Sequence, residues 1–318
     1  MTAAFHISIE ETTPMNQFRS FSSRIFLTGD QSRLRAGWRL LIAIFLTVMF
    51  FNVVDWVRSA LSLSGPTSLI ISRCIDVLVV TSALYITRRF VDKRSFASLG
   101  VNLNRRAGID ILMGITIGFV LMLAVYGIEY SVGWLKFESF AWQTDSQTVI
   151  ISQTLGYFAA YILTAWHEEL VYRGYVLQTL ASGLNLVWGI LISSVYFGIE
   201  HLSNPDSTWM AAAGIFFIAL FFTYGYVRTG QLWLPIGLHI GWNFFQSAVF
   251  GFPVSGLDRP GLLHITVSGP ELWTGGAFGP EAGLVILPIC VLGTVLVHIY
   301  TKRHKVVEAE AAVHPVLP

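Results

Sequence analysis

The sequence has little charge. Asp, Glu, Lys and Arg make up 12% of its 318 residues, about half of the roughly 25% usual in soluble domains. Hydrophobic residues make up 54% and aromatic residues 14%, and the formal net charge is +1. An excess of one sign, which a nucleic acid or another polyanionic partner would require, is therefore missing. This composition excludes an ordinary soluble protein and predicts no nucleic-acid partner.

Cysteine is also scarce, with two in the chain. Cys74 and Cys290 each lie inside an apolar run, whereas a disulfide framework or a CxxC metal site needs cysteines in polar loops. We therefore expect two inert core thiols. The N-terminus also lacks the basic and then apolar order of a cleavable signal peptide. We expect the first apolar run to be retained as an anchor.

Long apolar runs, in contrast, are abundant. A helix needs about 20 apolar residues to cross a hydrocarbon core about 30 Å thick. The runs predict an all-α membrane protein, a polytopic bundle of about eight transmembrane helices. They lie roughly at 36–57, 66–88, 107–134, 150–180, 184–203, 209–228, 231–251 and 282–301. The predicted organisation is an N-terminal segment 1–35, a transmembrane domain 36–301 and a disordered tail 302–318.

Basic residues flank these runs in three clusters, and by the positive-inside rule we expect all three to be cytoplasmic. The clusters are Arg19, Arg24, Arg33, Arg35 and Arg39, then Arg88, Arg89, Lys93, Arg94, Arg105 and Arg106, and finally Lys302, Arg303 and Lys305. An even number of crossings places both termini on the same side, in agreement with the charges. The non-cytoplasmic loops would then include 135–149 and 252–281, and the second is long enough to fold back against the bundle.

The fourth run contains charged residues near its middle. A charge at mid-membrane costs at least about 2.5–3.5 kcal/mol, so such residues tend to have partners or a function. Glu169 and Arg173 are spaced i, i+4, which allows an ion pair on one helix face. Glu168 points about 100° away and lacks that partner, and His167 precedes it.

Two later runs add polar groups at helical spacing. Phe197 lies one turn before His201, and His239 lies one turn before Asn243. Three helices could thus direct a carboxylate, two imidazoles and a carboxamide at one point. A buried carboxylate with two histidines can activate a water, either as a general base or by holding a metal.

Each of these polar residues also has a less specific interpretation. A single Glu–Arg pair or histidine can be a packing device, as we expect for Arg73 and Asp76 at spacing i, i+3. The same polar groups could form the relay of a proton-coupled transporter, which the residues alone do not separate from a protease. A non-catalytic immunity or scaffold membrane protein is a third alternative. The combined constellation favours a functional polar centre.

Three ordered motifs carry a more specific resemblance. Glu168-Glu169-x-x-x-Arg173, Phe197-x-x-x-His201 and His239-x-x-x-Asn243 follow one another on three apolar runs. In this they resemble the CPBP family of intramembrane proteases, which includes the Rce1-like type II CAAX prenyl endopeptidases and bacteriocin-processing relatives. The resemblance covers roughly residues 90–290, including the stretches SFASLGV, GFPVSG and TGGAFGPE.

The resemblance implies an intramembrane endopeptidase whose site residues are Glu168, Glu169, Arg173, His201, His239 and Asn243. Glu168 with His201 would activate the attacking water, and His239 and Asn243 would stabilise the oxyanion. Glu169 and Arg173 would support these residues from behind. We expect a glutamic mechanism that requires no cofactor. The metalloprotease alternative would place zinc on Glu168, His201 and His239, although Asn is a poor zinc ligand and no HExxH is present.

The partners implied by the resemblance are the lipid bilayer and a peptide or membrane-protein substrate, with prenylation left open. Because the flanking stretches look like those of bacterial members, we expect an integral protein of the bacterial plasma membrane, which is the inner membrane where a cell has two.

Overall fold

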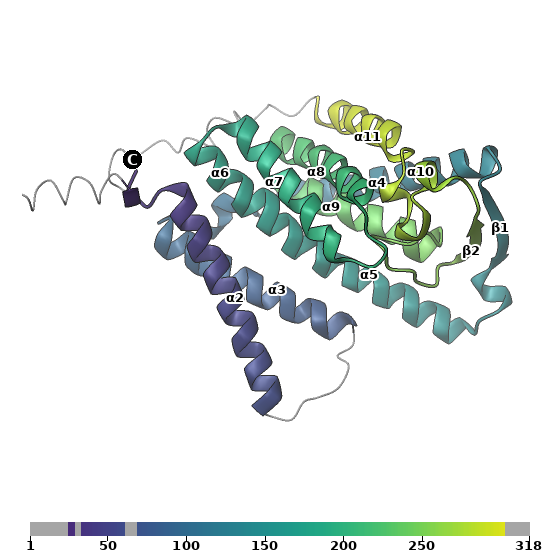
Figure 1. Cartoon of the computed structure of the whole chain (residues 1–318), viewed down its shortest axis with the longest axis horizontal. Coiled ribbons are helices and arrows are strands. Elements are labelled where there is room, and N and C mark those ends of the chain that lie inside the picture. Colours follow the sequence, from purple (N-terminus) through teal and green to yellow (C-terminus); the bar gives the residue numbers. More distant parts are fainter. Residues whose placement is uncertain (1–24, 29–32, 61–68, 303–318) are drawn as a thin grey trace, which may run out of the picture.

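A computed structural model describes residues 25–28, 33–60 and 69–302 (Figure 1). Most of the predicted N-terminal segment and residues 303–318 of the predicted disordered tail lie outside this part. Six helical segments among the described residues are long and apolar enough to cross a membrane. They span Ala36–Ala60, Leu69–Val91, Arg105–Ser131, Gln147–Gly183, Leu186–Ser203 and Trp209–Thr229. The chain is thus an all-α polytopic membrane protein.

These six segments match the first six predicted runs and contain seven α-helices. The helices are α2 (Ala36–Ala60), α3 (Leu69–Ile86), α4 (Arg105–Ser131), α5 (Gln147–Glu169), α6 (Gln178–Gly183), α7 (Leu186–Glu200) and α8 (Trp209–Thr229). The last two runs form shorter apolar helices, α9 (Trp233–Asn243) and α11 (Ile286–Thr301). The fold class is therefore confirmed, and the number of eight spanning helices is approximate.

Several helices begin where a polar side chain caps the backbone. Asn104, Ser146, Asn185 and Thr208 each accept a hydrogen bond from an N–H group in the first turn of α4, α5, α7 and α8. Such caps satisfy donors that have no partner within the helix. They fix where four of the apolar helices start.

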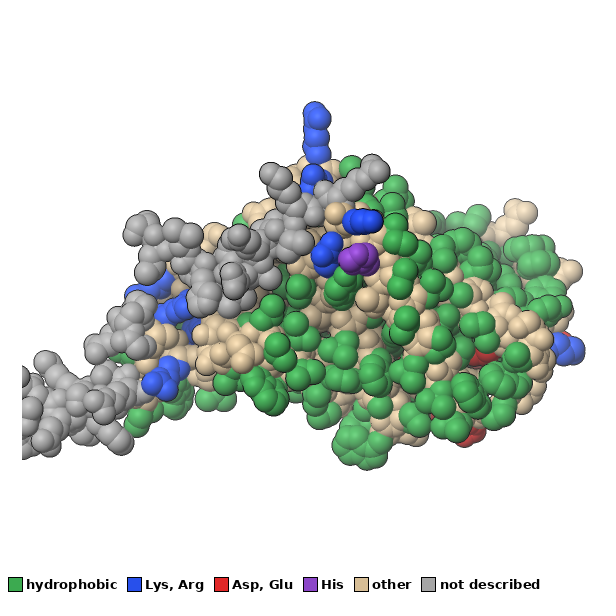
Figure 2. Space-filling model, turned by 90° about the horizontal axis from the view of Figure 1, so that it is seen from above, with side chains coloured by type: hydrophobic (Ala, Val, Ile, Leu, Met, Phe, Trp, Pro, Cys, Tyr) green, Lys and Arg blue, Asp and Glu red, His purple; other side chains and the backbone are tan. Residues whose placement is uncertain are grey.

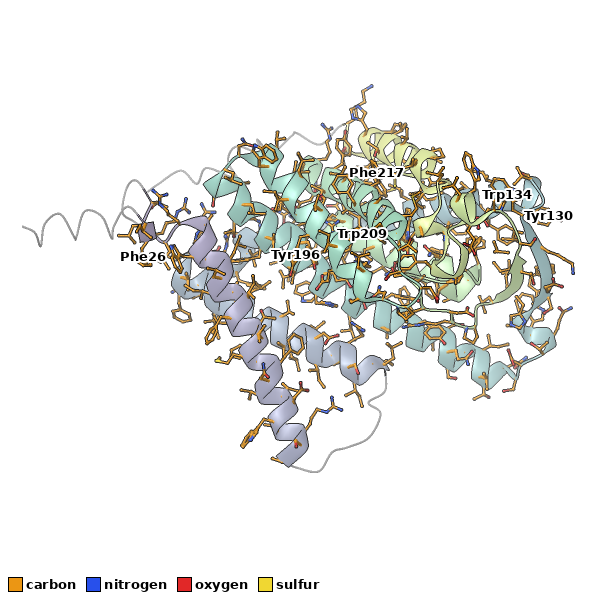
Figure 3. All side chains as sticks on the ribbon, in the orientation of Figure 1. Phe26, Tyr130, Trp134, Tyr196, Trp209 and Phe217 are labelled. Carbon is orange, nitrogen blue, oxygen red and sulfur yellow. The ribbon has the colours of Figure 1, made fainter. Side chains whose placement is uncertain are left out.

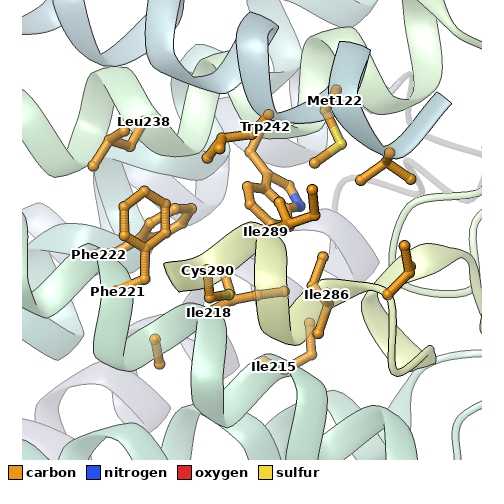
Figure 4. Close-up of a cluster of buried hydrophobic side chains, with 14 of the residues drawn as sticks. Met122, Ile215, Ile218, Phe221, Phe222, Leu238, Trp242, Ile286, Ile289 and Cys290 are labelled. Atoms are coloured by element: carbon orange, nitrogen blue, oxygen red, sulfur yellow. The ribbon is translucent and has the colours of Figure 1, made fainter. Parts of the chain in front are cut away.

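The bundle has a well-packed centre and a loosely attached edge. In α8, 61% of the apolar window is buried by the protein, against 6% in α2. Figure 1 shows α2 diverging from the other helices along its length. The main core joins α4, α8, α9 and α11 (Figure 4), with the labelled side chains Met122, Ile215, Ile218, Phe221, Phe222, Leu238, Trp242, Ile286, Ile289 and Cys290.

Glycines let α9 approach α4 closely. A Cβ added at Gly118 of α4 would lie 2.6 Å from the backbone carbon of Gly241, and one at Gly241 would lie 2.6 Å from the carbonyl oxygen of Ile115. Gly114 and Gly237 face backbone atoms of the opposite helix in the same way. The small-xxx-small spacing of α4 thus serves helix packing, as predicted, and it fixes the position of α9.

The two predicted external loops contain strands that the sequence analysis missed. Strand β1 (Leu135–Phe140) pairs with β2 (Leu263–Val267) in an antiparallel ribbon with an irregularity between Phe137 and Ser139. The strands are short and separated by more than 120 residues, so no local turn pattern predicts their pairing. The chain then folds back, and a Cβ at Gly214 of α8 would collide with the backbone oxygen of Glu281.

One expectation about the cysteines is wrong. Cys290 on α11 is buried, but Cys74 on α3 is exposed. Helix α3 lies at the edge of the bundle, where an apolar run can face lipid instead of protein. Hydropathy does not distinguish these two environments, because lipid chains are as apolar as a protein core.

The surface is consistent with a membrane protein. Figure 2 shows hydrophobic side chains over most of one face, with Lys and Arg mainly towards its left and top. Figure 3 places Tyr130 and Trp134 together at the end of α4, next to the β-ribbon. Large aromatic side chains such as Tyr130 and Trp209 are 58% and 74% exposed, and such residues are typical of membrane interfaces.

Candidate active site

The two adjacent glutamates lie where α5 changes its winding. Helix α5 ends at Glu169, and a π-helical segment, Leu170–Leu177, continues it. A second π-helical segment, Phe244–Val249, begins directly after Asn243 of α9. Such local widening of a helix frequently occurs at functional sites, because it changes which way side chains point.

Glu169 and Arg173 form the ion pair that their spacing predicts. Arg173 Nη1 lies 2.8 Å from Glu169 Oε1, and both side chains are almost completely buried. Arg173 also donates from Nη2 to the carbonyl oxygen of Ala219 at 3.1 Å. Its guanidinium carbon lies 4.8 Å from the ring centroid of Phe197. The pair therefore connects α5 to α7 and α8.

Glu169 also holds His239. The Nδ1 atom of His239 lies 2.9 Å from Glu169 Oε1, and a carboxylate oxygen only accepts hydrogen bonds, so Nδ1 carries the proton. The other ring nitrogen, Nε2, then faces Glu168, whose Oε2 atom is 3.7 Å away. Helical spacing predicts the contact of Glu169 with Arg173 but not its contact with His239.

His201 is oriented by its own helix. Its Nδ1 atom lies 2.8 Å from the carbonyl oxygen of Phe197, so Nδ1 is again the donor and Nε2 is left with a lone pair. The two rings pack at a centroid distance of 4.6 Å. The phenylalanine of the second motif thus fixes the histidine through both its backbone and its ring, and it also stacks on Arg173.

A cavity of about 780 Å³ connects these residues. Four of the six predicted site residues line it, namely Glu168, His201, His239 and Asn243. Glu169 and Arg173 lie behind this wall. The side chain of Glu168 is 19% exposed and that of Glu169 is 0% exposed, so the first glutamate can reach a water and the second cannot.

Three other polar residues singled out in the sequence lie outside the three motifs. His167 lines the cavity, and its Nε2 atom lies 3.9 Å from Glu168 Oε1. Arg73 and Asp76 form the expected i, i+3 ion pair at 2.8 Å, with side chains 33% and 24% exposed.

One buried carboxylate of the cavity wall, Glu281, is not among the site residues predicted from the sequence. Glu281 accepts hydrogen bonds from Trp242 Nε1 at 3.1 Å and from the backbone and hydroxyl of Ser255 at 2.6 and 2.9 Å. Burial raises the pKa of the Glu281 carboxyl, and the hydrogen bonds from Ser255 oppose this shift. Glu281 ties the returning loop to the residue before Asn243. Its place in TGGAFGPE, a loop with few charges, was the signal available in the sequence.

Glu168, His201 and His239 are the residues that the metalloprotease alternative would use as zinc ligands. Zinc sites need three protein ligand atoms converging on one point at about 2.0–2.2 Å. Within the described ranges, no group of three His, Cys, Asp or Glu side chains is arranged to hold a metal ion.

Comparison with known proteins supports the resemblance. Residues 150–245 match the family model described as "Type II CAAX prenyl endopeptidase Rce1-like". This segment contains all three motifs. A Bacillus subtilis (strain 168) protein named "Putative membrane peptidase YdiL" is 30% identical over 141 residues, which are 43% of this chain and 55% of that protein. The resemblance to the CPBP family is therefore confirmed over the region that carries the site.

The extent of these matches is limited. The chain spans about half the length of the curated relative it matches. No solved structure matches the chain significantly.

Proposed function

We propose that this chain is an intramembrane endopeptidase of the CPBP type, with Glu168 as the base that activates water. The observation that carries the proposal is the difference in exposure and in contacts between the two adjacent glutamates. Glu168 borders the cavity beside His239, whereas Glu169 is buried and occupied by Arg173 and His239. Glu168 is accessible to a water in the cavity, and Glu169 behind it fixes the imidazole of His239. This arrangement is suited to hydrolysis.

The proposed reaction begins with a water between Glu168 and His201. Glu168 accepts a proton while the water oxygen attacks the scissile carbonyl carbon, and His201 orients the water through the lone pair of Nε2. The tetrahedral intermediate then collapses, and the proton on Glu168 passes to the leaving amine. The C–N bond breaks in this step, giving a free amine and a carboxylic acid that releases its remaining proton to solvent, so the glutamate returns to its initial carboxylate state.

The oxyanion needs hydrogen-bond donors, and Asn243 supplies one from its amide group. Neutral His239 has its proton on Nδ1, so it can donate from Nε2 only as an imidazolium. Two carboxylates within 4 Å, at 2.9 and 3.7 Å, favour that charged form. Glu169, held by Arg173, would thus orient His239, and the carboxylates of Glu168 and Glu169 would favour the imidazolium that donates to the oxyanion.

The cavity walls are consistent with a membrane-bound substrate. Leu40, Ile44 and Phe51 of α2 and Ile192 of α7 line the cavity that contains Glu168. We propose that the substrate is a peptide or a membrane-protein segment, with or without a prenyl group. We also propose the bacterial plasma membrane as the location, with both termini in the cytoplasm. Engineered cysteines at residues 15 and 310 that react only from the external face would contradict this orientation.

Cleavage by the purified protein tests the function. The protein would be reconstituted in liposomes and given a farnesylated CAAX peptide and an unlipidated peptide mixture, with products identified by mass spectrometry. We expect cleavage by the unaltered protein and none above background by Glu168→Gln. Glu200→Gln is the matched control, because it removes an exposed carboxylate from the rim of the same cavity. Equal cleavage by unaltered protein and Glu168→Gln, or none by either, would contradict the proposal.

A further inference from the structure

Arg259 lies at the cavity wall away from the three motifs. It belongs to the loop before β2, and its guanidinium carbon is 5.4 Å from the ring centroid of Tyr157 and 5.7 Å from that of Tyr161. Both tyrosines are on α5. Stacking of a guanidinium on aromatic rings holds its plane in place. Arg259, Tyr161 and Glu168 all line the same cavity.

The guanidinium has no acidic partner in the described part of the chain. Other arginines in the bundle interior, such as Arg39, Arg88 and Arg173, each form an ion pair with Asp or Glu. Arg259 has neither an ion pair nor a hydrogen bond to any described residue. An arginine offers five N–H donors in a fork that matches a carboxylate, and here they are not used within the protein.

The aromatic platform under Arg259 is itself fixed. The hydroxyl of Tyr161 lies 2.7 Å from the hydroxyl of Ser247, and this contact is buried. The neighbouring carboxylate of Glu281 is occupied by Trp242 and Ser255. The guanidinium is therefore held in one place and not neutralised there, which is the arrangement expected of a binding group for an anion.

Its distance from the proposed base follows from helix geometry. Tyr161 and Tyr157 precede Glu168 by seven and eleven residues, which is close to two and three full turns. All three therefore lie on one face of α5. At about 1.5 Å per residue, the tyrosines are about 10 and 16 Å along the helix from Glu168. An extended peptide covers this distance in about three to five residues.

We propose that Arg259 is a specificity site that binds a carboxylate of the substrate, about three to five residues from the scissile bond. The carboxylate is either the C-terminal group of the peptide or an acidic side chain. The position along the peptide rests on the proposed protease function, because it assumes that the scissile bond lies at Glu168. The binding of a carboxylate at Arg259 does not require turnover.

Binding is measured in the Glu168→Gln protein, so that no cleavage intervenes. Four dye-labelled apolar decapeptides serve as probes in fluorescence polarisation. One has a free C-terminal carboxylate and one a C-terminal amide, and two further amides carry either Glu or Gln four residues from the C-terminus. Each is titrated against protein with Arg259, Arg259→Met or Arg259→Lys. Arg105→Met, which removes an exposed arginine at the start of α4, is the control.

We expect a carboxylate peptide to bind about tenfold more tightly than its neutral counterpart, since charge-assisted hydrogen bonds are the strong ones. This ratio should fall to about one in Arg259→Met and to an intermediate value in Arg259→Lys, and stay unchanged in Arg105→Met. A preference for the free C-terminus identifies the α-carboxylate, and a preference for Glu over Gln identifies a side chain. Equal binding of all four peptides, or a ratio that survives in folded Arg259→Met, would overturn the proposal. If the unaltered protein cleaves no peptide but the Glu168→Gln protein still prefers carboxylate peptides through Arg259, the result would count against the protease function alone.

Discussion

Among the described residues, two clusters of buried ion pairs differ in what surrounds them. The first, here called the anchor network, joins Arg39, Arg88 and Asp92, whose side chains are at most 2% exposed. Each oxygen of Asp92 lies 3.2 Å from one of the two arginines. None of these three residues lines the cavity. The second cluster is the candidate active site, where Glu168 and His239 border the cavity.

The difference lies in the bonding capacity that remains after folding. In the anchor network, Arg88 also donates to Gln178 at 2.8 Å, so the charges hold the start of α2 against the segment after α3 and against α6. In the candidate site, His201 keeps a free Nε2 lone pair and Glu168 is partly exposed to the cavity. Buried charge alone thus does not identify a reactive site. The unused bonding capacity that faces the cavity is what makes the second cluster the candidate site.

Removing the proposed base should have the largest effect. Glu168→Gln keeps the shape of the side chain but cannot accept the proton, and we expect turnover to fall by about 10²–10⁴-fold. Thermal stability in detergent should not change, because the contacts of Glu168 with described residues, at 3.7 and 3.9 Å, are too long to be strong hydrogen bonds. Peptide cleavage and a melting curve measured on the same preparation check both parts. Near-full turnover would exclude Glu168 as the base.

Breaking the anchor network should do the opposite. Asp92→Ala leaves two buried guanidiniums without a carboxylate, and we expect a loss of about 3–5 kcal/mol in unfolding free energy. The kcat of the folded fraction should remain within about twofold, because the network does not border the cavity. Asp76→Ala is the matched control. It breaks a partly exposed ion pair and should change stability by less than about 1 kcal/mol.

Arg173→Ala should produce both kinds of effect, each smaller. Glu169 keeps its contact with His239, so its charge is not left without a partner. We therefore expect a loss of about 1.5–3 kcal/mol in unfolding free energy. Because Arg173 helps to hold the carboxylate that orients His239, kcat should also fall, by about tenfold. Unchanged stability together with unchanged kcat would remove the bracing role and would weaken the distinction between the two clusters.

The sequence predicts these regions unequally. The Glu169–Arg173 pair and the Gly114–Gly118 packing follow from helical spacing, which is local. The anchor network follows only in part, because Arg88 and Asp92 are spaced i, i+4 but Arg39 lies 53 residues before Asp92. The basic members of the network look like ordinary positive-inside charges. For the same reason, local spacing does not predict the β-ribbon, the hydrogen bonds of Glu281 to Trp242 and Ser255, or the stacking of Arg259 on two tyrosines. In each case, residues from distant loops meet only after the helices have packed.

The smallest expected effect is that of removing metal. A zinc enzyme would need Glu168, His201 and His239 as ligands, and no group of three His, Cys, Asp or Glu side chains in the described ranges is arranged to hold a metal ion. We therefore expect purified, active protein to contain less than about one equivalent of transition metal and to keep its activity after exhaustive chelation. Metal analysis and cleavage before and after chelator treatment are the measurements. A different result would identify Glu168, His201 and His239 as zinc ligands. In that case the chelator would inhibit cleavage, stoichiometric zinc would restore it, and His239→Ala would lose the bound metal. The candidate site would then differ from the anchor network by a bound cation as well as by its free bonding capacity, and water activation would pass from the glutamate to the metal.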